Sequence, residues 1–217
     1  MDTFFGKTSV VQALRAALPA LHGRVLDVGC GRQPFRNLIL SGQNVTGYIG
    51  MDLGNNHYAE VVPDLVWDGN SIPLPADSVG SIVCTEVLEH CPDPARVLAE
   101  CRRVLEPGGL MVATVPFLFP LHDVPHDYWR YTPYAVEMLL SSAGFRHWEI
   151  RPMGGWNAAL AHMLGLWAVR SLMRTLTRRI VGRLAMPVYR YLLARDQPPA
   201  NFDKPGMIVR LTFSARK

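Results

Sequence analysis

Short apolar runs alternate with amphipathic stretches over the first two thirds of the chain. The apolar runs are rich in β-branched and aliphatic residues and end at polar residues or glycine, a pattern typical of strands. They predict strands over residues 24–28, 46–52, 65–67, 81–85 and 110–115. Strands that alternate with helices favour a mostly parallel sheet covered on both faces, so we expect a doubly wound α/β fold.

The stretches between these runs carry helix start and stop signals. They predict helices over residues 10–18, 34–40, 94–105 and 133–143. Prolines stand in the first turn of three of them, Thr132 is a suitable N-cap, and Gly144 is a suitable stop. Residues 106–109, Glu-Pro-Gly-Gly, predict the end of the third helix.

The last third departs from this alternation. A strand over residues 147–151 is followed by its expected partner only at 207–214, which predicts an insertion over residues 155–200 of a single domain, 1–217. Apolar residues and arginines alternate over 156–195, and Pro187 is expected to break this stretch into two or three helices. The most apolar part, 156–169, is shorter than the roughly 20 residues of a membrane span.

Composition and charge narrow the class of protein. A hydrophobic content of 49% with 18% charged residues and no low-complexity tract indicates a folded globular chain rather than a disordered one. The N-terminus lacks the pattern of a signal peptide, so we expect a cytoplasmic protein. The four cysteines form no C-x-x-C pair, which favours reduced thiols over disulfides or a zinc site.

The positive charge is concentrated near the C-terminus. Residues 1–145 contain nine Lys+Arg against fifteen Asp+Glu, whereas residues 146–217 contain thirteen against three. Such a region can bind anionic lipid or nucleic acid, but it can also be a solvated surface. We do not expect nucleic acid as a partner.

Candidate binding residues follow the first three strands. Asp27 precedes the glycine turn of Gly29 and Gly31, where its carboxylate could accept from a cationic amine but would repel a pyrophosphate. Asp52 ends the second strand, where a carboxylate can accept both hydroxyls of a ribose. Asp68 and Gly69 end the third and could meet an adenine, although an aspartate there is also a common turn residue. The carboxyl ends of parallel strands share one crevice.

Together these motifs resemble a known family. VLDVGCG, Asp52, DGNSIPLPADSVGSIVCTEVLEHCPDP and RVLEPGGLMVATVP are similar to the class I S-adenosylmethionine-dependent methyltransferases of the bacterial type 11 kind, over about residues 20–150. The resemblance implies a seven-stranded sheet with an antiparallel last strand and S-adenosyl-L-methionine as the cofactor. It implies that the cofactor contacts Asp27, Gly29, Gly31, Asp52, Leu53, Asp68, Gly69 and Thr85. Gln33 stands where the family usually has a third glycine.

The segment 115–132 is the candidate acceptor loop. His122 or His126 could take a proton from an acceptor hydroxyl, Asp123 or Asp127 could orient the imidazole, and Arg130 could hold an acidic acceptor. Alternatively, Asp127 and Arg130 form a structural pair that fixes the loop. The same histidines and aspartates could in principle bind zinc or iron, but we expect no metal site.

The leading hypothesis is methyl transfer to a small-molecule, glycan or lipid-linked acceptor, at oxygen. The alternatives are a non-catalytic S-adenosylmethionine-binding partner subunit and an NAD-dependent oxidoreductase. The chain is expected to be a monomer or homodimer. Residues 156–195 could form a lid over the acceptor, a subunit interface or a peripheral membrane contact, or a helix pair that packs on itself and on the sheet edge.

Overall fold

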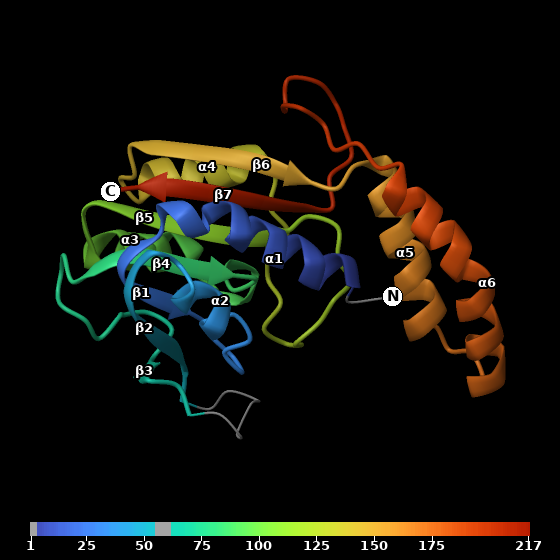
Figure 1. The fold of residues 1–217 in the computed structure, drawn as a ribbon, viewed down its shortest axis with the longest axis horizontal. Coiled ribbons are helices and arrows are strands. Elements are labelled where there is room, and N and C mark those ends of the chain that lie inside the picture. The colour runs from blue at the N-terminus through green and yellow to red at the C-terminus, as the bar shows by residue number, and fades with distance from the viewer. Residues whose placement is uncertain (1–3, 55–61) are drawn as a thin grey trace.

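A seven-stranded sheet forms the centre of the computed structural model, which describes residues 4–54 and 62–217 (Figure 1). The strand order is β3-β2-β1-β4-β5-β7-β6. The strands are β1 (His22–Val28), β2 (Asn44–Leu53), β3 (Leu65–Trp67), β4 (Val79–Thr85), β5 (Leu105–Pro116), β6 (His147–Met153) and β7 (Arg210–Arg216). Strand β7 pairs antiparallel with β5 and β6, and the other pairs are parallel. The predicted doubly wound, mostly parallel sheet is confirmed.

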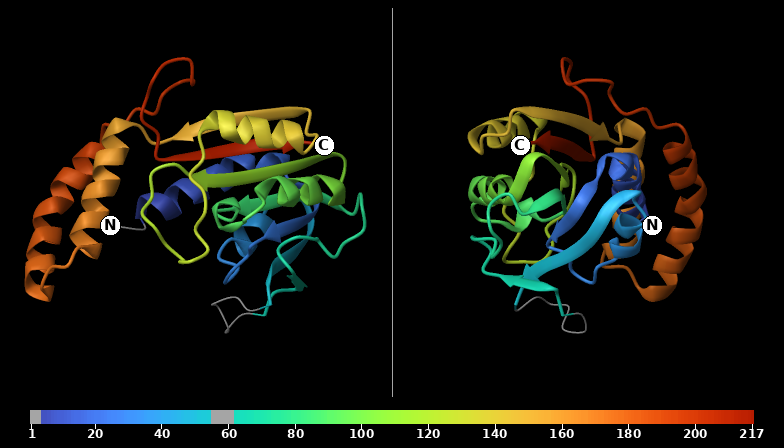
Figure 2. Two further views of the ribbon diagram at one scale, coloured as in Figure 1. Left: turned by 180° about the vertical axis from the view of Figure 1, so that it is seen from behind. Right: turned by 60° about the vertical axis from the view of Figure 1, so that its left-hand side comes forward.

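Alternate residues of the central strands face opposite sides of the sheet, and each side is covered by helices. Leu26 and Val28 of β1 pack in the cluster that includes α3 (Pro94–Val104) and α4 (Pro133–Ser142), whereas Val25 packs in the cluster beneath α1 (Phe4–Ala17) and α2 (Arg36–Leu40). Figure 2 shows the two helix layers on either side of the sheet. This follows from the period of two along a strand.

The insertion forms a helical hairpin beyond the carboxyl ends of the parallel strands, with α5 (Trp156–Arg170) next to α6 (Thr175–Ala194) (Figures 1 and 2). Asp196, which follows α6, accepts from the backbone N–H groups of Gly155 and Ala158, both at 2.8 Å. These bonds satisfy amides at the start of α5 and close the base of the hairpin. No helix in the described part of the chain is long and apolar enough to cross a bilayer.

Two sequence predictions about this region need correction. Pro187 lies inside α6, and the break between the helices falls at residues 171–174 instead. Proline has no N–H group, so Pro187 leaves the carbonyl of Arg183, four residues earlier, without its helical hydrogen bond. Both residues are exposed, and water can donate to that carbonyl instead. The last strand spans residues 210–216 rather than 207–214.

The predicted end of the third helix before residues 106–109 is confirmed, since α3 ends at Val104. Residues 106–109 themselves belong to β5, because Leu105 already pairs with Val79 of β4. The register shifts between Val79 and Ser81, and Gly108 has a φ of +77° at this irregularity. Helix α2 begins at Arg36, two residues later than the sequence predicted.

Candidate active site

The backbone conformation of the turn after β1 requires glycine at residues 29 and 31. Gly29 and Gly31 have φ angles of +67° and +51°, in the left-handed region that favours glycine. A Cβ atom on Gly29 would lie 2.4 Å from Cγ2 of Val87, so a side chain there would displace the segment after β4. The backbone N–H of Gly29 donates to the Met51 carbonyl at 2.8 Å, which joins the turn to β2.

Gln33 occupies the position where a third glycine is usual, and it also adopts a left-handed φ, +54°. Its backbone N–H donates to the Cys30 carbonyl at 2.8 Å, and its side-chain oxygen accepts from the Arg36 guanidinium at 2.7 Å. A glutamine in this conformation is uncommon, and these two contacts hold it there. The loop therefore turns left-handed at residue 33 without a glycine.

Asp27 is a buried carboxyl group at the end of β1, only 2% exposed. The Tyr48 hydroxyl donates to it at 2.6 Å. Burial raises the pKa of Asp27 to about 7; the Tyr48 hydrogen bond acts in the opposite direction, and the charge of Asp52 adds to the rise. A cationic group bound at this carboxyl would favour its ionised form. No sequence pattern pointed to Tyr48, which lies in the middle of β2.

Asp52 links the turn to the end of β2. One of its carboxylate oxygens accepts from the Gly31 backbone N–H at 2.7 Å, and the other accepts from the Leu53 N–H at the same distance. Both oxygens therefore have fixed positions, with further lone pairs for other donors. Of the predicted cofactor residues, Gly31, Asp52 and Leu53 are thus brought into direct contact. The Leu53 side chain is exposed.

Asp68 directly follows β3, and no hydrogen bond joins its side chain to Gly31, Asp52 or Leu53. Its carboxylate accepts from the backbone N–H groups of Ser71 and Asn70 at 2.7 and 2.8 Å, and these bonds lower its pKa. This is the turn geometry that the sequence left as the alternative role. Gly69 has a φ of +82°, and Thr85 ends β4 half-buried.

The candidate acceptor loop, predicted over 115–132, begins at residue 117 because β5 ends at Pro116, and hydrogen bonds anchor it to the segment after β4. The Glu89 carbonyl accepts from the Tyr128 N–H at 2.8 Å, and the Trp129 indole donates to the Cys91 carbonyl at 2.9 Å. The Tyr131 hydroxyl donates to the Leu88 carbonyl in the same segment. The aromatic residues of the loop thus attach it to residues 88–91.

Arg130 uses all five of its N–H groups within this loop. Two of them donate to the two carboxylate oxygens of Asp127, at 2.7 and 2.8 Å. The other three donate to the carbonyls of Phe119, Pro120 and Trp129. The guanidinium holds the pKa of Asp127 well below its usual range. A guanidinium has five donors, so this geometry is that of the structural pair considered from the sequence.

His122 is oriented by the same carboxylate. Its Nδ1 lies 3.2 Å from Asp127 Oδ2 and 3.3 Å from the Pro120 carbonyl. Both neighbours are acceptors, which assigns the proton to Nδ1 and the lone pair to Nε2. Burial, followed by the charge of His90, lowers the pKa of His122. The imidazole is therefore neutral near pH 7.

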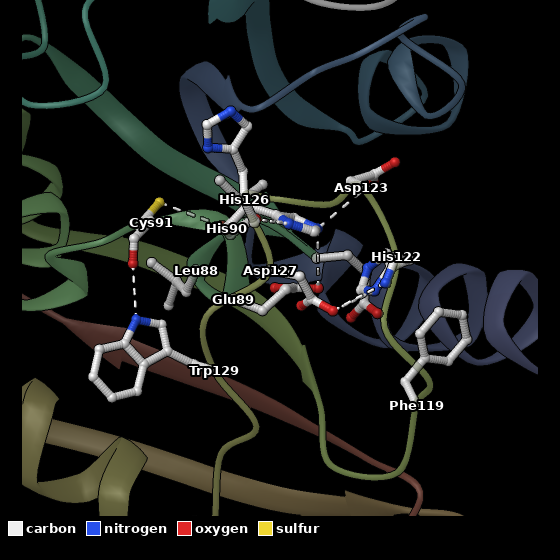
Figure 3. Close-up of polar contacts among 12 residues, drawn as sticks. Leu88, Glu89, His90, Cys91, Phe119, His122, Asp123, His126, Asp127 and Trp129 are labelled. Carbon is white, nitrogen blue, oxygen red and sulfur yellow. Dashed lines mark hydrogen bonds and ion pairs between the residues drawn. The ribbon is translucent and has the colours of Figure 1, made fainter.

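Glu89 and His90 complete the cluster (Figure 3). From the sequence, the family resemblance implied only that the stretch after the fourth strand, which contains Glu86, Glu89 and His90, borders the cofactor and the acceptor, and Glu89 could equally have been a helix-facing carboxylate. His90 Nδ1 donates to the His126 carbonyl at 2.7 Å, and the His90 ring centre lies 4.7 Å from that of His122. The Glu89 side chain is fully buried, and neither of its carboxylate oxygens has a hydrogen-bond partner. Burial, and then the nearby Glu86, raise its pKa well above the usual range. The His126 ring is exposed and points away from Glu89.

Among the described residues, Glu89, His90 and His122 offer ligand atoms that lie within 4.8 Å of one another. One carboxylate and two imidazoles are ligands that suit zinc, iron or manganese. This set shares only His122 with the histidines and aspartates of the loop that were considered from the sequence. Asp127 does not belong to it, and its carboxylate is paired with Arg130.

Glu86, between this cluster and β4, is held in an uncommon conformation with a φ of +55°. Its carboxylate accepts from Arg210 of β7 and from the Thr114 hydroxyl, at 2.7 and 2.8 Å. Arg210 also donates to the Ser9 hydroxyl of α1 at 2.7 Å. The sequence did not reveal Arg210 because β7 joins the site only through the folding of the sheet.

Part of this chain is similar to a known protein family. Residues 26–113 match the model of a methyltransferase domain family. This range contains the glycine turn, Asp52, Asp68 and the Glu89–His90 segment, and it ends just before the acceptor loop.

Curated relatives match about half of the chain. The malonyl-[acyl-carrier protein] O-methyltransferase of Alcanivorax borkumensis is 31% identical over 131 residues, 56% of this chain and 44% of that protein. The ubiquinone biosynthesis O-methyltransferase of Paracidovorax citrulli is 36% identical over 103 residues, 42% of this chain and 43% of that protein. The chain thus spans less than half the length of these relatives.

Solved structures share the fold over most of the chain. A SAM-dependent methyltransferase from Archaeoglobus fulgidus superposes with a TM-score of 0.60 at 17% identity, covering 96% of this chain and 92% of that one. Phosphoethanolamine N-methyltransferase 2 of Haemonchus contortus, in complex with S-adenosyl-L-methionine, gives 0.59 at 15% identity, covering 97% and 52%. At these identities the similarity shows the fold alone.

Proposed function

We propose that this chain is a class I S-adenosylmethionine-dependent methyltransferase and that it transfers the methyl group of that cofactor to an oxygen atom of a small-molecule, glycan or lipid-linked acceptor. The observation that carries the proposal is the pair Asp27 and Asp52. These two carboxyl groups are fixed at the ends of adjacent strands, on either side of a left-handed glycine turn.

The residues at the strand ends fit the cofactor. Among the described residues no cationic side chain pairs with the buried Asp27, and the ammonium of the methionine end would supply a cation there. Gly29 and Gly31 let that end approach the backbone. Asp52 would accept the ribose hydroxyls, and Leu53 and Gly69 would border the adenine with Asp68. Thr85 would line the methionine side. When bound, the sulfonium supplies an activated methyl group, so positioning is the main task of the protein.

On the acceptor side we assign the base to His122. Its Nε2 lone pair is available because Nδ1 faces Asp127, and its lowered pKa keeps it neutral. Asp127 and Arg130 act as positioning residues that hold this imidazole and the loop, since Arg130 has no N–H left for an acidic acceptor. His126, exposed and turned away, contributes its carbonyl to His90 rather than its ring.

Acceptor chemistry at oxygen is supported by the curated relatives, which are O-methyltransferases. It also agrees with a neutral imidazole that can take a hydroxyl proton. An oxidoreductase is disfavoured because the carboxylate of Asp27 beside the turn would repel a pyrophosphate. A purely binding subunit would not need the oriented imidazole of His122.

A methyl-transfer screen tests the proposal. The protein would be incubated with methyl-labelled S-adenosylmethionine and panels of phenols, carboxylic acids, sugars and lipid-linked acceptors. Label in an oxygen-methylated product, with release of S-adenosylhomocysteine, is the expected result. Label found only on nitrogen or sulfur would contradict the acceptor atom, and a protein that binds no S-adenosylhomocysteine would contradict the function as a whole.

A further inference from the structure

The outward face of α6 is apolar and exposed. Its residues occur every three or four positions, so they share one side of the helix, and each is at least half exposed. This outer stripe consists of Leu176, Ile180, Leu184, Val188 and Tyr191. The buried residues of α6, Ala185 and Tyr189, lie on the opposite side of the helix, and α6 packs against α5. In Figure 2, α6 is the outermost helix of the molecule.

A row of arginines runs along one edge of the outer stripe. Arg179, Arg183 and Arg190 are exposed, and their spacing of four and seven residues places them on one adjoining side of α6. Residues 156–195 contain seven arginines and no acidic residue. The surface of the hairpin is therefore both apolar and strongly cationic.

We propose that the outer stripe of α6 docks this protein on a membrane surface rich in anionic phospholipid. An apolar stripe bordered by arginines fits the boundary between lipid headgroups and acyl chains, because the leucine and isoleucine side chains can enter it while guanidinium groups meet phosphates. The docking is peripheral, since α6 does not meet the requirement for a membrane span. It does not depend on the proposed methyl transfer.

Other occupants fit this surface less well. A second copy packed antiparallel across a two-fold axis would place the same patch against itself, which brings the arginine rows near each other with no acidic residue of residues 156–195 between them. A nucleic acid would attract the arginines but offers little to an apolar stripe of five side chains. Anionic lipid satisfies both parts of the surface.

The hairpin also contacts the acceptor loop. The His162 ring of α5 stacks on Phe119 with ring centres 5.6 Å apart, and the Arg170 guanidinium lies over the same phenyl ring at 5.6 Å. A membrane bound by α6 would consequently be coupled through α5 to the loop that borders the proposed acceptor site. This position suits an acceptor that is presented by a lipid.

Vesicle flotation with the full chain tests the proposal. Vesicles of phosphatidylcholine with phosphatidylglycerol would be compared with vesicles of phosphatidylcholine alone, at low and high salt. We expect binding to the anionic vesicles that weakens at high salt. Arg183→Glu with Arg190→Glu should weaken partitioning by about tenfold or more, and Ile180→Gln with Leu184→Gln should also weaken it by about tenfold.

Matched controls distinguish an effect of this surface on vesicle binding from an effect of the net charge or of the exposed apolar area of the whole protein. Arg15→Glu with Arg146→Glu makes the same charge change elsewhere, and Leu40→Gln with Met138→Gln removes exposed apolar side chains elsewhere; both should bind like the parent protein. Several results would overturn the proposal: no flotation with anionic vesicles, equal binding to both vesicle types, or equal losses in the control variants. So would a dimer in light scattering that only the α6 variants dissociate.

Discussion

The cofactor half and the acceptor half of the site are built from different kinds of contact. At the ends of β1 and β2, the Asp52 carboxylate accepts from the backbone amides of Gly31 and Leu53, and Asp27 accepts from the Tyr48 hydroxyl of the neighbouring strand. In the acceptor loop, side chains such as Arg130 and Trp129 bond to backbone carbonyls of the loop and of the segment after β4. The first half is fixed by the sheet, and the second depends on its own network of hydrogen bonds.

This difference means that substitutions should separate the two halves. Changes in the cofactor half should alter the affinity for S-adenosylhomocysteine, whereas changes in the acceptor loop should alter turnover or stability and leave that affinity unchanged. Four predictions test the separation.

The largest effect is expected at His122. His122→Gln should lower kcat about a hundredfold, because a positioned general base contributes about 10² to 10⁴ to the rate. The affinity for S-adenosylhomocysteine, measured by calorimetry, should not change. The matched control is His126→Gln, whose ring is exposed; an equal loss of kcat in that variant would remove His122 as the base.

Asp127 should control the stability of the loop. Asp127→Asn should lower the free energy of unfolding by about 2 kcal/mol, since it weakens two charged hydrogen bonds to Arg130. The folded pKa of Asp127 is lowered, so its contribution is full above the unfolded value of about 4 and is lost as the pH falls toward the folded value. Chemical denaturation at pH 7 and at low pH measures this.

The control for Asp127 is Asp123→Asn, because Asp123 is exposed in the same loop. It should leave the unfolding free energy at pH 7 nearly unchanged. Similar losses in both variants would show that the Asp127–Arg130 pair has no special role.

In the cofactor half, Asp52→Ala should weaken S-adenosylhomocysteine binding by about tenfold or more, which is about 1.4 kcal/mol. The variant loses the acceptor for the ribose hydroxyls and the bond that orients Gly31. Asp77→Ala, which changes an exposed carboxylate paired with Lys217, is the control. Unchanged affinity in the Asp52 variant would exclude this carboxylate from the site.

The smallest effect concerns pH and Asp27. Its pKa in the free protein is about 7, so binding of an ammonium group must first remove a proton at lower pH. The dissociation constant of S-adenosylhomocysteine should fall by roughly fivefold to tenfold between about pH 6 and pH 7.5. Asp27→Asn should bind more weakly and abolish this dependence; a pH dependence that persists in that variant must come from another group.

The sequence predicted the strands and the glycine turn of the cofactor half because these signals are local, whereas the contacts with the cofactor stay predictions. The alternation of strands and helices, the glycine turn and the carboxylates at strand ends all follow from residues near one another in the chain. The turn role of Asp68 and the pairing of Asp127 with Arg130 remained alternatives, since spacing does not reveal which hydrogen bonds form. Tyr48 and Arg210 were missed because they reach the site from β2 and β7 only after the sheet assembles. Pro187 was misread because an exposed proline can remain inside a helix.

Hydrogen–deuterium exchange with saturating S-adenosylhomocysteine tests whether the crevice at the strand ends binds the methyl donor. We expect slower exchange in residues 27–33, 51–54 and 67–71, the ends of β1, β2 and β3, with NAD giving no such change. Protection confined to other parts of the chain, or protection of these segments by NAD and not by S-adenosylhomocysteine, would contradict the assignment of this crevice to the methyl donor.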